Sequence, residues 1–281
     1  MMPSLFLSHG SPMIALEPSP AADFLVRLAP VIERVHGRPR AVVIVSPHTS
    51  TRVPYVLSAP RHEAIHDFGG FPQALFDLRY NPPGDPALAA DVAQRLNAAG
   101  IATQLAEAAG IDHGIWTLLR RMWPAADVPV VPLSLVPNWR PAQQWAIGAA
   151  LADLAQDDVL IIGSGSFTHN LGRFFGARGE TRTAIEPDVV AFQQWVAERA
   201  AARDWPALLD YRVQAPGAAL QHPTDEHWLP FYVAAGAGGE ATQPQRLHDS
   251  VDLGLLAMDG YAFGPAASAL AEALKKDSVP A

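Results

Sequence analysis

The amino-acid sequence predicts a single-domain α/β fold over residues 1–281, with helices flanking a central sheet that is mostly parallel or mixed. Short apolar runs alternate along the chain with longer segments of helical spacing. This is the pattern of folds in which strands and helices follow each other in turn. Hydrophobic residues make up 49% of the chain, which is enough for one large core. The sequence contains no internal repeat and no linker long enough to separate two domains.

The first 50 residues predict a strand, a helix and a second strand. Residues 5–8 are an apolar run that stops at the turn sequence His9-Gly10-Ser11-Pro12. Residues 20–36 have apolar side chains at helical spacing. Residues 41–45 are a β-branched run that ends through Ser46-Pro47-His48. Each of the two strands therefore delivers a histidine at its end.

The middle of the chain continues the alternation of strands and helices. Predicted helices cover residues 85–97, 113–123 and 140–154, and predicted strands cover residues 101–105 and 128–136. Residues 159–163 form a third strongly apolar strand, which leads into a Gly/Ser turn and then His169.

The C-terminal third predicts two more helices, at residues 186–202 and 225–235. A Gly/Ala/Pro-rich loop follows over residues 234–244, and residues 245–263 are expected to form an edge strand or hairpin. The end of the chain, residues 275–281, is expected to be frayed.

Charge and cysteine content exclude several classes of partner and site. The formal net charge is −8 and no cluster of Lys or Arg exceeds a short pair, so we expect no nucleic acid and no anionic membrane as partner. The chain has no cysteine, and a metal would therefore be held by His, Asp or Glu. Neither a signal peptide nor a membrane-spanning run is visible, which favours a cytoplasmic location.

The histidines suggest a shared site. Three of the ten lie in polar stretches where we expect surface positions, namely His36, His62 and His248. His9, His48 and His169 instead follow apolar strands through short turns. In a parallel sheet these ends meet at one edge, where ligands gather. A single histidine at a strand end is usually a hydrogen-bonded structural residue, but three such positions favour a common site.

The segment around Glu226 and His227 offers a third metal ligand. Thr224 is expected to cap a helix that begins at Asp225, and consecutive residues of a helix lie about 100° apart. Only one of Glu226 and His227 therefore faces the site. With His9 and His48, Glu226 would complete the two-histidine, one-carboxylate face of non-haem Fe(II). His227 would give a three-histidine site that also suits Zn(II).

Six motifs now resemble a known family, in the same order and from about residue 3 to residue 263. The family is that of the 4,5-DOPA extradiol dioxygenases, which belong with the class III extradiol ring-cleaving dioxygenases and are related to the catalytic subunit of protocatechuate 4,5-dioxygenase. The motifs are Leu7-Ser8-His9-Gly10-Ser11-Pro12, Ser46-Pro47-His48, Ile65-His66-Asp67-Phe68-Gly69-Gly70-Phe71-Pro72, Asp112-His113-Gly114-Ile115-Trp116, Thr168-His169-Asn170-Leu171 and Pro223-Thr224-Asp225-Glu226-His227-Trp228-Leu229-Pro230.

The resemblance implies an α/β fold and a non-haem Fe(II) enzyme that uses O₂ to open a catechol ring to a semialdehyde. By position, His9 and His48 match the family's metal histidines. His227 matches the third metal histidine of DOPA-type members, whereas the wider class uses a glutamate, for which Glu226 is the nearest candidate. We expect Fe(II) in catalysis and consider Zn(II) plausible in a purified sample, because Zn(II) outcompetes Fe(II) for such ligands.

The resemblance also implies roles around the metal. His169 matches the acid/base histidine and His113 a second pocket histidine, and a neutral imidazole can take and return a catechol proton. Both are therefore candidate catalytic residues. The expected partners are a catechol such as L-DOPA and O₂, and the resemblance to a self-sufficient chain implies a monomer or simple homo-oligomer.

The substrate pocket has further candidates and the function has alternatives. His66, Phe68 and Phe71 are expected to form part of the pocket wall, against the alternative of a core-packing loop with glycine turns. Tyr261 is expected to reach the pocket if the last strand lies beside the metal. A zinc hydrolase on the same histidines is one alternative, although no HExxH helix is present. A non-catalytic binding protein of the same fold is the other.

Overall fold

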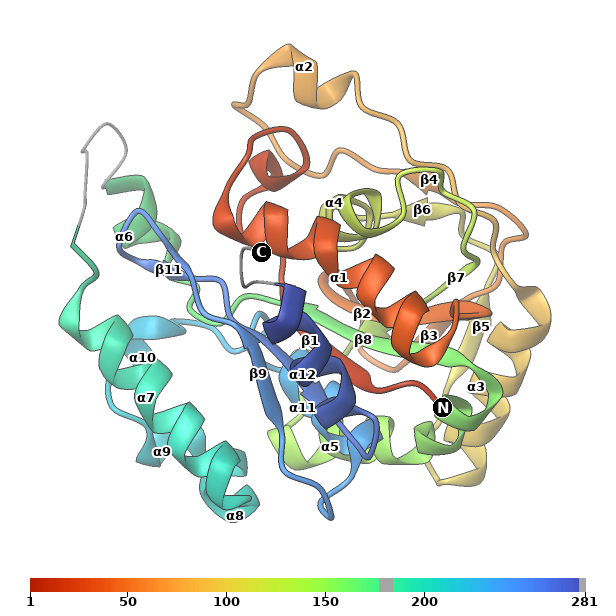
Figure 1. Ribbon diagram of the computed structural model, residues 1–281. Helices are drawn as coiled ribbons and strands as arrows, with labels where there is room; N and C mark the ends of the chain where they lie inside the picture. The colour runs from red at the N-terminus through yellow and green to blue at the C-terminus, as the bar shows by residue number, and fades with distance from the viewer. Residues whose placement is uncertain (177–183, 278–281) are drawn as a thin grey trace.

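The computed structural model describes residues 1–176 and 184–277 and confirms the α/β class (Figure 1). In this part of the chain the main sheet has eight strands in the order β5-β3-β7-β2-β8-β1-β12-β9. The bounds of these strands are β1 Ser4–Ser8, β2 Ala41–Ser50, β3 Tyr55–Leu57, β5 Gln104–Ala106, β7 Val130–Leu135, β8 Val159–Gly165, β9 Gln245–His248 and β12 Gly260–Phe263.

The sheet is mixed, with a parallel centre. Strands β7, β2, β8 and β1 are neighbours and run parallel. Strand β3 runs antiparallel to β7, and β12 runs antiparallel to both β1 and β9. The predicted hairpin near the C-terminus is therefore confirmed as β9 and β12, with β9 at the sheet edge. Because the central strands are parallel, the carboxyl ends of β1, β2 and β8 lie at one edge.

Helices cover both faces of the sheet, and alternate residues of β2 show the two faces. Val43 and Val45 are buried in the hydrophobic core on one face, while Val42 and Ile44 are buried in the core on the other. Figure 1 shows α1 and α12 on the same face. That face carries α1 Pro20–His36, α4 His113–Met122 and α12 Ala267–Asp277. The opposite face carries α3 Pro86–Ala98, α5 Pro141–Ala150, α7 Pro187–Ala202 and α11 Pro230–Gly238.

Short elements connect these layers and surround the carboxyl edge. Two small two-stranded sheets pair β4 with β6 and β10 with β11. The short elements are η1 Pro12–Ala15, β4 Glu63–Ala64, α2 Gln73–Phe76, β6 Gly110–Ile111, η2 Ala152–Asp157, α6 Leu171–Gly176, α8 Trp205–Leu209, α9 Tyr211–Gln214, α10 Ala218–Gln221, β10 Val251–Asp252 and β11 Leu256–Ala257. Within the described residues, no helix is both long and apolar enough to cross a membrane.

The predicted helix at residues 225–235 begins later than expected. Residues 225–229 form bends and turns, and α11 starts at Pro230. Thr224 does not cap a helix, because its hydroxyl donates to the carboxylate of Glu226. Proline suits the first helical position, where no N–H partner is needed. Glu226 and His227 therefore lie in a turn. The expectation that only one of them faces the site assumed helical geometry and does not apply to a turn.

Other segments differ from expectation in ways that packing explains. Helix α12 was not predicted, although Ala267, Leu270, Ala271 and Leu274 are spaced so that they pack on the sheet. Residues 275–277, which we expected to be frayed, complete this helix, and residues 278–281 lie outside the described chain.

The predicted helix 140–154 is divided into α5 and the 3₁₀ helix η2. The loop 234–244 is shorter because α11 continues to Gly238.

Two of the histidines that we expected at the surface are held by local contacts instead. His62 is buried, with its ring Nε2 donating to the carbonyl of Val130 at 3.0 Å. Val130 is the first residue of strand β7, and the imidazole supplies the hydrogen bond that its buried carbonyl needs. The ring of His248 stacks on Phe24, with centroids 4.7 Å apart and planes at 9°. The surface prediction is therefore wrong for His62, and His248 is half-buried.

Candidate metal centre

Three imidazoles converge at the carboxyl edge of the sheet. His9 directly follows β1, His48 lies two residues before the end of β2, and His227 comes from the turn before α11. The Nε2 atoms of His9 and His48 are 3.2 Å apart, and those of His48 and His227 are 3.3 Å apart. The structure thus brings together the three histidines that the sequence selected from distant segments.

All three imidazoles are held neutral. Burial, followed by the charges of His48 and His227, lowers the pKa of His9 well below its ordinary value. Burial and then the nearby His113 lower the pKa of His48 to about 3. Burial and then His169 lower the pKa of His227. Near pH 7 each ring therefore keeps a nitrogen lone pair.

Hydrogen bonds fix which nitrogen carries that lone pair. The Ser164 hydroxyl donates to the carbonyl of Gly114 at 2.5 Å, so it can only accept from Nδ1–H of His9, 2.9 Å away. The carboxylate of Glu226 accepts from Nδ1–H of His227 at 3.2 Å. Because an ionised carboxylate has no proton to donate, His9 and His227 both present a bare Nε2 to Nε2 of His48.

Such an arrangement fits a bound metal ion. A single Nε2–H on His48 could serve only one of these two bare nitrogens, so at least one of them faces Nε2 of His48 at 3.2–3.3 Å with no proton between them, a contact that suits a bound cation. Metal–nitrogen bonds of about 2.1 Å place neighbouring ligand nitrogens about 3.2 Å apart at coordination angles near 100°. Partners on Nδ1 that orient the ring are also typical of metal-binding histidines. The three-histidine group therefore has the geometry and the donor atoms of a metal-binding site, and the ligand atoms of His9, His48 and His113 also lie within 4.8 Å of one another.

Glu226 lies on the opposite side of the His227 ring from the converging nitrogens. Its carboxylate contacts Nδ1 of His227 and the hydroxyl of Thr224. The ligand atoms of Glu226, His169 and His227 nevertheless lie within 4.8 Å of one another. The geometry favours His227 at the metal with Glu226 orienting its ring.

A buried carboxylate shapes the segment that carries His48. Asp112 accepts from the hydroxyls of Ser46 at 2.7 Å and Thr49 at 2.5 Å. Burial raises the pKa of Asp112, while the bonds from these two hydroxyls act in the opposite direction. The pairing of β2 with β7 shifts register between Ser46 and Ser50. The hydroxyl–carboxylate bonds thus fix the irregular stretch of β2 that presents His48.

The turn that carries His227 lies directly on strand β8. The carbonyl of His227 accepts from the backbone N–H of Ser166 at 2.9 Å. A side chain on Gly165 would collide with that same carbonyl oxygen. The glycine is therefore needed for the close approach of turn and strand, and this approach sets the position of His227.

Two further histidines border the metal site. The ring of His113, at the start of α4, lies 3.9 Å from that of His48 between centroids. The ring of His169, four residues after the end of β8, lies 3.4 Å from that of His227 between centroids. Burial lowers the pKa of His169 to about 4, although the nearby Glu226 raises it in part. His169 is therefore a neutral proton acceptor near pH 7.

The five histidines open into a small apolar cavity of about 150 Å³, here called the inner cavity. Most of the remaining wall is aromatic or aliphatic, namely Phe68, Phe71, Leu171, Phe174, Phe175 and Leu256, and Gly10, Ser11, Pro12 and Asn170 complete it. A larger space of about 520 Å³, here called the outer groove, adjoins it. The two share the lining residues Ser11, Phe71 and Phe174.

The other predicted pocket residues divide into two groups. Phe68 and Phe71 line the inner cavity. His66 lies behind this wall, where its ring packs against Phe68 at 5.7 Å and Trp116 at 5.4 Å between centroids. It is not among the residues that line the cavity.

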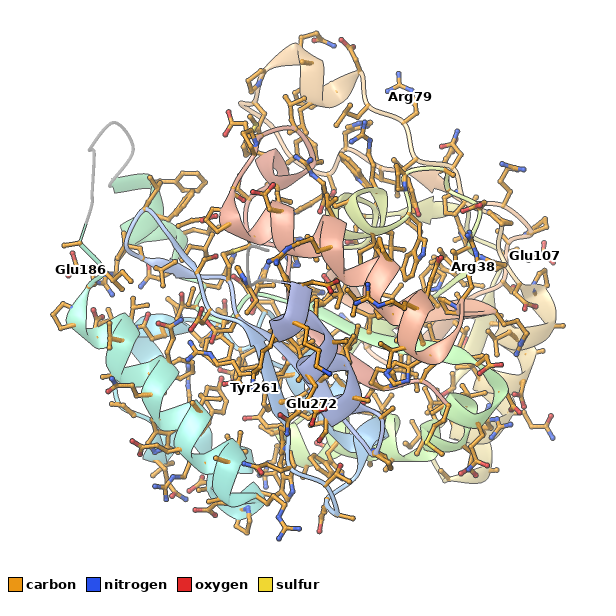
Figure 2. The ribbon with its side chains drawn as sticks, in the orientation of Figure 1. Arg38, Arg79, Glu107, Glu186, Tyr261 and Glu272 are labelled. Carbon is orange, nitrogen blue, oxygen red and sulfur yellow. The ribbon has the colours of Figure 1, made fainter. Side chains whose placement is uncertain are left out.

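Tyr261 does not reach the pocket. It is buried in the core, with its ring 5.8 Å from that of Phe231 (Figure 2). The register of β12 explains this, because Tyr261 pairs with Phe6, three residues before His9. Its side chain therefore packs under α11 and away from the carboxyl edge.

Several residues of the site were not selected from the sequence. Asp67 accepts from the ring of His113 at 2.9 Å, and Asp112 and Ser164 hold His48 and His9. A signal existed for two of them, since Asp67 and Asp112 lie inside the quoted motifs, beside His66 and His113. Ser164 had no such signal, because its role depends on the pairing of β8 with β1.

Comparisons with known proteins agree with this fold and site. A family model described as the catalytic LigB subunit of aromatic ring-opening dioxygenase matches residues 3–264. The chain is thus an extradiol aromatic ring-opening dioxygenase, which confirms the predicted enzyme class. The chain belongs to the LigB family.

Individual relatives match over nearly the whole chain. The 4,5-DOPA dioxygenase extradiol of Beta vulgaris is 34% identical over 263 residues, covering 92% of this chain and 96% of the relative. The protein of that name from Escherichia coli strain K12 is 35% identical over 270 residues, covering 94% and 95%. A crystal structure of an uncharacterized Escherichia coli K12 protein has a TM-score of 0.78 at 29% identity, covering 94% of this chain and 100% of that one. The resemblance that the motifs predicted is confirmed.

Proposed function

We propose that this protein is a non-haem Fe(II)-dependent extradiol dioxygenase that uses O₂ to open the ring of a substituted catechol to a semialdehyde. The observation that carries the proposal is the convergence of three neutral imidazole Nε2 atoms beside a cavity of about 150 Å³. Relatives named 4,5-DOPA dioxygenase extradiol support the substrate class, because DOPA is a catechol. The family match favours this reaction over the hydrolase and non-catalytic alternatives.

His9, His48 and His227 would hold the metal, and Glu226 would orient His227. Ferrous ion bound there supplies open positions for catechol and O₂ together. Zn(II) suits the same three histidines, and we expect it in samples purified without added iron. Around the metal, the described residues supply nitrogen donors and no thiolate, because the chain has no cysteine.

His169 and His113 would handle the protons. A catechol must lose a hydroxyl proton on binding, and His169 is neutral and lines the inner cavity. It would accept this proton and return it when the ring opens. His113 lines the same cavity from the side of His48 and would serve as a second proton carrier.

The cavity shape suggests how the substrate lies. The apolar rings of Phe68 and Phe71 would face the catechol ring and exclude water from it. The ring then points its substituent through the shared opening at Ser11, Phe71 and Phe174 into the outer groove. This is why we propose a catechol that carries a side chain.

Anaerobic reconstitution tests the proposal. Metal-free protein is loaded with Fe(II), a panel of catechols including L-DOPA is added, and air is admitted. We expect O₂ uptake and a yellow ring-opened product from at least one catechol. No O₂ uptake from any catechol, with stoichiometric iron bound, would refute the proposed reaction. His9→Ala and His48→Ala should each lose the metal, while His248→Ala, a histidine on β9, should keep it.

A further inference from the structure

Asp67 makes an unusual double contact with one residue. It lies in the loop between β4 and α2, and a single carboxylate oxygen, Oδ1, accepts two hydrogen bonds from His113. One comes from the backbone N–H at 3.0 Å and the other from the ring Nδ1 at 2.9 Å. Main chain and side chain of His113 are therefore both held by the same oxygen, 46 residues away in sequence.

This contact determines the tautomer of His113. A carboxylate accepts hydrogen bonds only, so Nδ1 carries a proton, and in the neutral ring Nε2 is then the nitrogen with the lone pair. Among the described residues, no other side chain hydrogen-bonds the His113 ring. The ring is itself buried, with 8% of the side chain exposed, and it lines the inner cavity. Without Asp67, nothing else in this part of the chain would select one tautomer.

The same loop supplies the cavity wall. Phe68 follows Asp67 directly, and its ring lies 5.6 Å from that of His113 and 5.4 Å from that of Phe71 between centroids. The loop backbone has its own anchor at Ile65, whose carbonyl accepts from the Trp116 indole at 2.9 Å. Loop and helix α4 are therefore already joined by other contacts, so the Asp67 bonds are not required merely to attach them.

We propose that Asp67 is a positioning residue for the ring-opening reaction: it fixes His113 with Nε2 unprotonated, ready to accept a proton from the bound catechol. The inference rests on the proposed function, since it assigns His113 a task in that reaction. The second carboxylate oxygen lies 3.9 Å from Nδ1 of His48, which is too far for a hydrogen bond. Asp67 therefore acts through His113 and not as a partner of the metal ligand.

A matched pair of substitutions separates hydrogen bonding from shape and charge. Asp67→Asn keeps an acceptor oxygen, and the backbone N–H of His113, which can only donate, orients the amide so that this oxygen also meets Nδ1. Asp67→Leu has the same branching and no acceptor. We expect kcat to fall by about 10- to 100-fold in Asp67→Leu with little change in KM, and to recover largely in Asp67→Asn. Asp77→Ala, an exposed aspartate at the end of α2, is the control.

Nitrogen-15 NMR of labelled histidines gives a second readout in Zn(II)-loaded protein, where no turnover occurs. His113 should be a single Nδ1–H tautomer in the wild type and in Asp67→Asn, and a mixture in Asp67→Leu. Bound metal should stay stoichiometric in all three. If Asp67→Leu does not fold, Asp67→Ala replaces it.

Two results would overturn the proposal: an unchanged tautomer in Asp67→Leu, or equal loss of kcat in the Asn and Leu variants. A wild type that turns over no catechol would instead count against the proposed function, and the NMR result would still decide the role of Asp67 in holding His113.

Discussion

The imidazole rings of His169 and His227 lie face to face, with centroids 3.4 Å apart and planes at 10°. His227 uses its Nδ1 for Glu226 and directs Nε2 toward His48, so its orientation is set. His169 packs flat on this fixed ring. Burial already lowers the pKa of His169 to about 4. His169 is therefore a free base near pH 7, stacked on a proposed metal ligand and able to take up a proton.

Replacement of His169 by phenylalanine should separate catalysis from metal binding. The His169→Phe variant keeps a flat ring on His227 and removes both nitrogens. We expect metal content equal to wild type and a kcat lower by about 10²- to 10⁴-fold, the usual contribution of a general base. Metal analysis and O₂ uptake measure the two quantities. Loss of the metal in this variant would show that His169 is a ligand instead.

The third metal ligand can be decided by comparing His227→Ala with Glu226→Gln. If His227 binds the metal, its removal should reduce metal content to background. Glu226→Gln removes the negative charge but keeps an acceptor oxygen for Nδ1, so the metal should bind stoichiometrically with an affinity lowered by no more than about 10- to 100-fold. Competition with a chelator measures both. Equal loss of metal in the two variants would point to the carboxylate as the ligand.

Stability should decrease in acid, and His222 offers a test of one contribution. Its buried ring donates from Nε2 to the Phe167 carbonyl at 2.9 Å, and burial lowers its pKa from 6.5 to about 3. Between pH 3 and pH 6.5, His222 binds a proton in the unfolded chain but not in the folded one. This histidine alone should then lower the free energy of unfolding by about 1.4 kcal/mol per pH unit as the pH falls below 6.5.

His222→Gln can keep the bond to Phe167 and cannot titrate. Urea unfolding of metal-free wild type and variant at several values from pH 7.5 to pH 5 should give a shallower decline for the variant. Parallel curves would mean that His222 does not titrate on unfolding as its burial suggests.

The outer groove should select catechols by charge. Within the described residues, the charged side chains that line it are Glu17 and Asp252. Dopamine and dihydroxyphenylpropionate carry substituents of similar length and opposite charge, and we expect the higher kcat/KM for dopamine. Glu17→Gln should reduce the ratio of the two kcat/KM values, dopamine over dihydroxyphenylpropionate, by a factor of up to about 5. High salt should reduce this ratio as well. If neither the substitution nor salt changes this ratio, the substituent of the catechol does not lie in the outer groove.

Local patterns were sufficient to predict the parallel part of the sheet and the convergence of its histidines. The runs at residues 5–8, 41–45 and 159–163 are almost purely apolar because helices cover both sheet faces. The ends of β1 and β8 could therefore be located within two residues, whereas β2 continues five residues beyond its apolar run, to Ser50. His9 and His48 followed directly, since the carboxyl ends of neighbouring parallel strands share one edge.

Features that depend on contacts between distant segments could not be predicted in this way. Tyr261 lies in the core because β12 pairs with β1 in a register that no local pattern specifies. Asp67 meets His113 across 46 residues. The turn at His227 looked helical because Asp225 and Glu226 resemble a helix start, whereas Pro230 was the actual first helical residue.

The contact between Gly165 and the turn of His227 bears on how this enzyme could change over evolution or in the laboratory. Because strand β8 lacks a side chain at that point, a single added methyl group would push one metal ligand away from the other two while leaving every ligand in the sequence. Motif searches would still recognise such a variant as an intact dioxygenase. A library at position 165 would thus sample metal-site geometries, and with them metal preference, that no substitution of a histidine can reach.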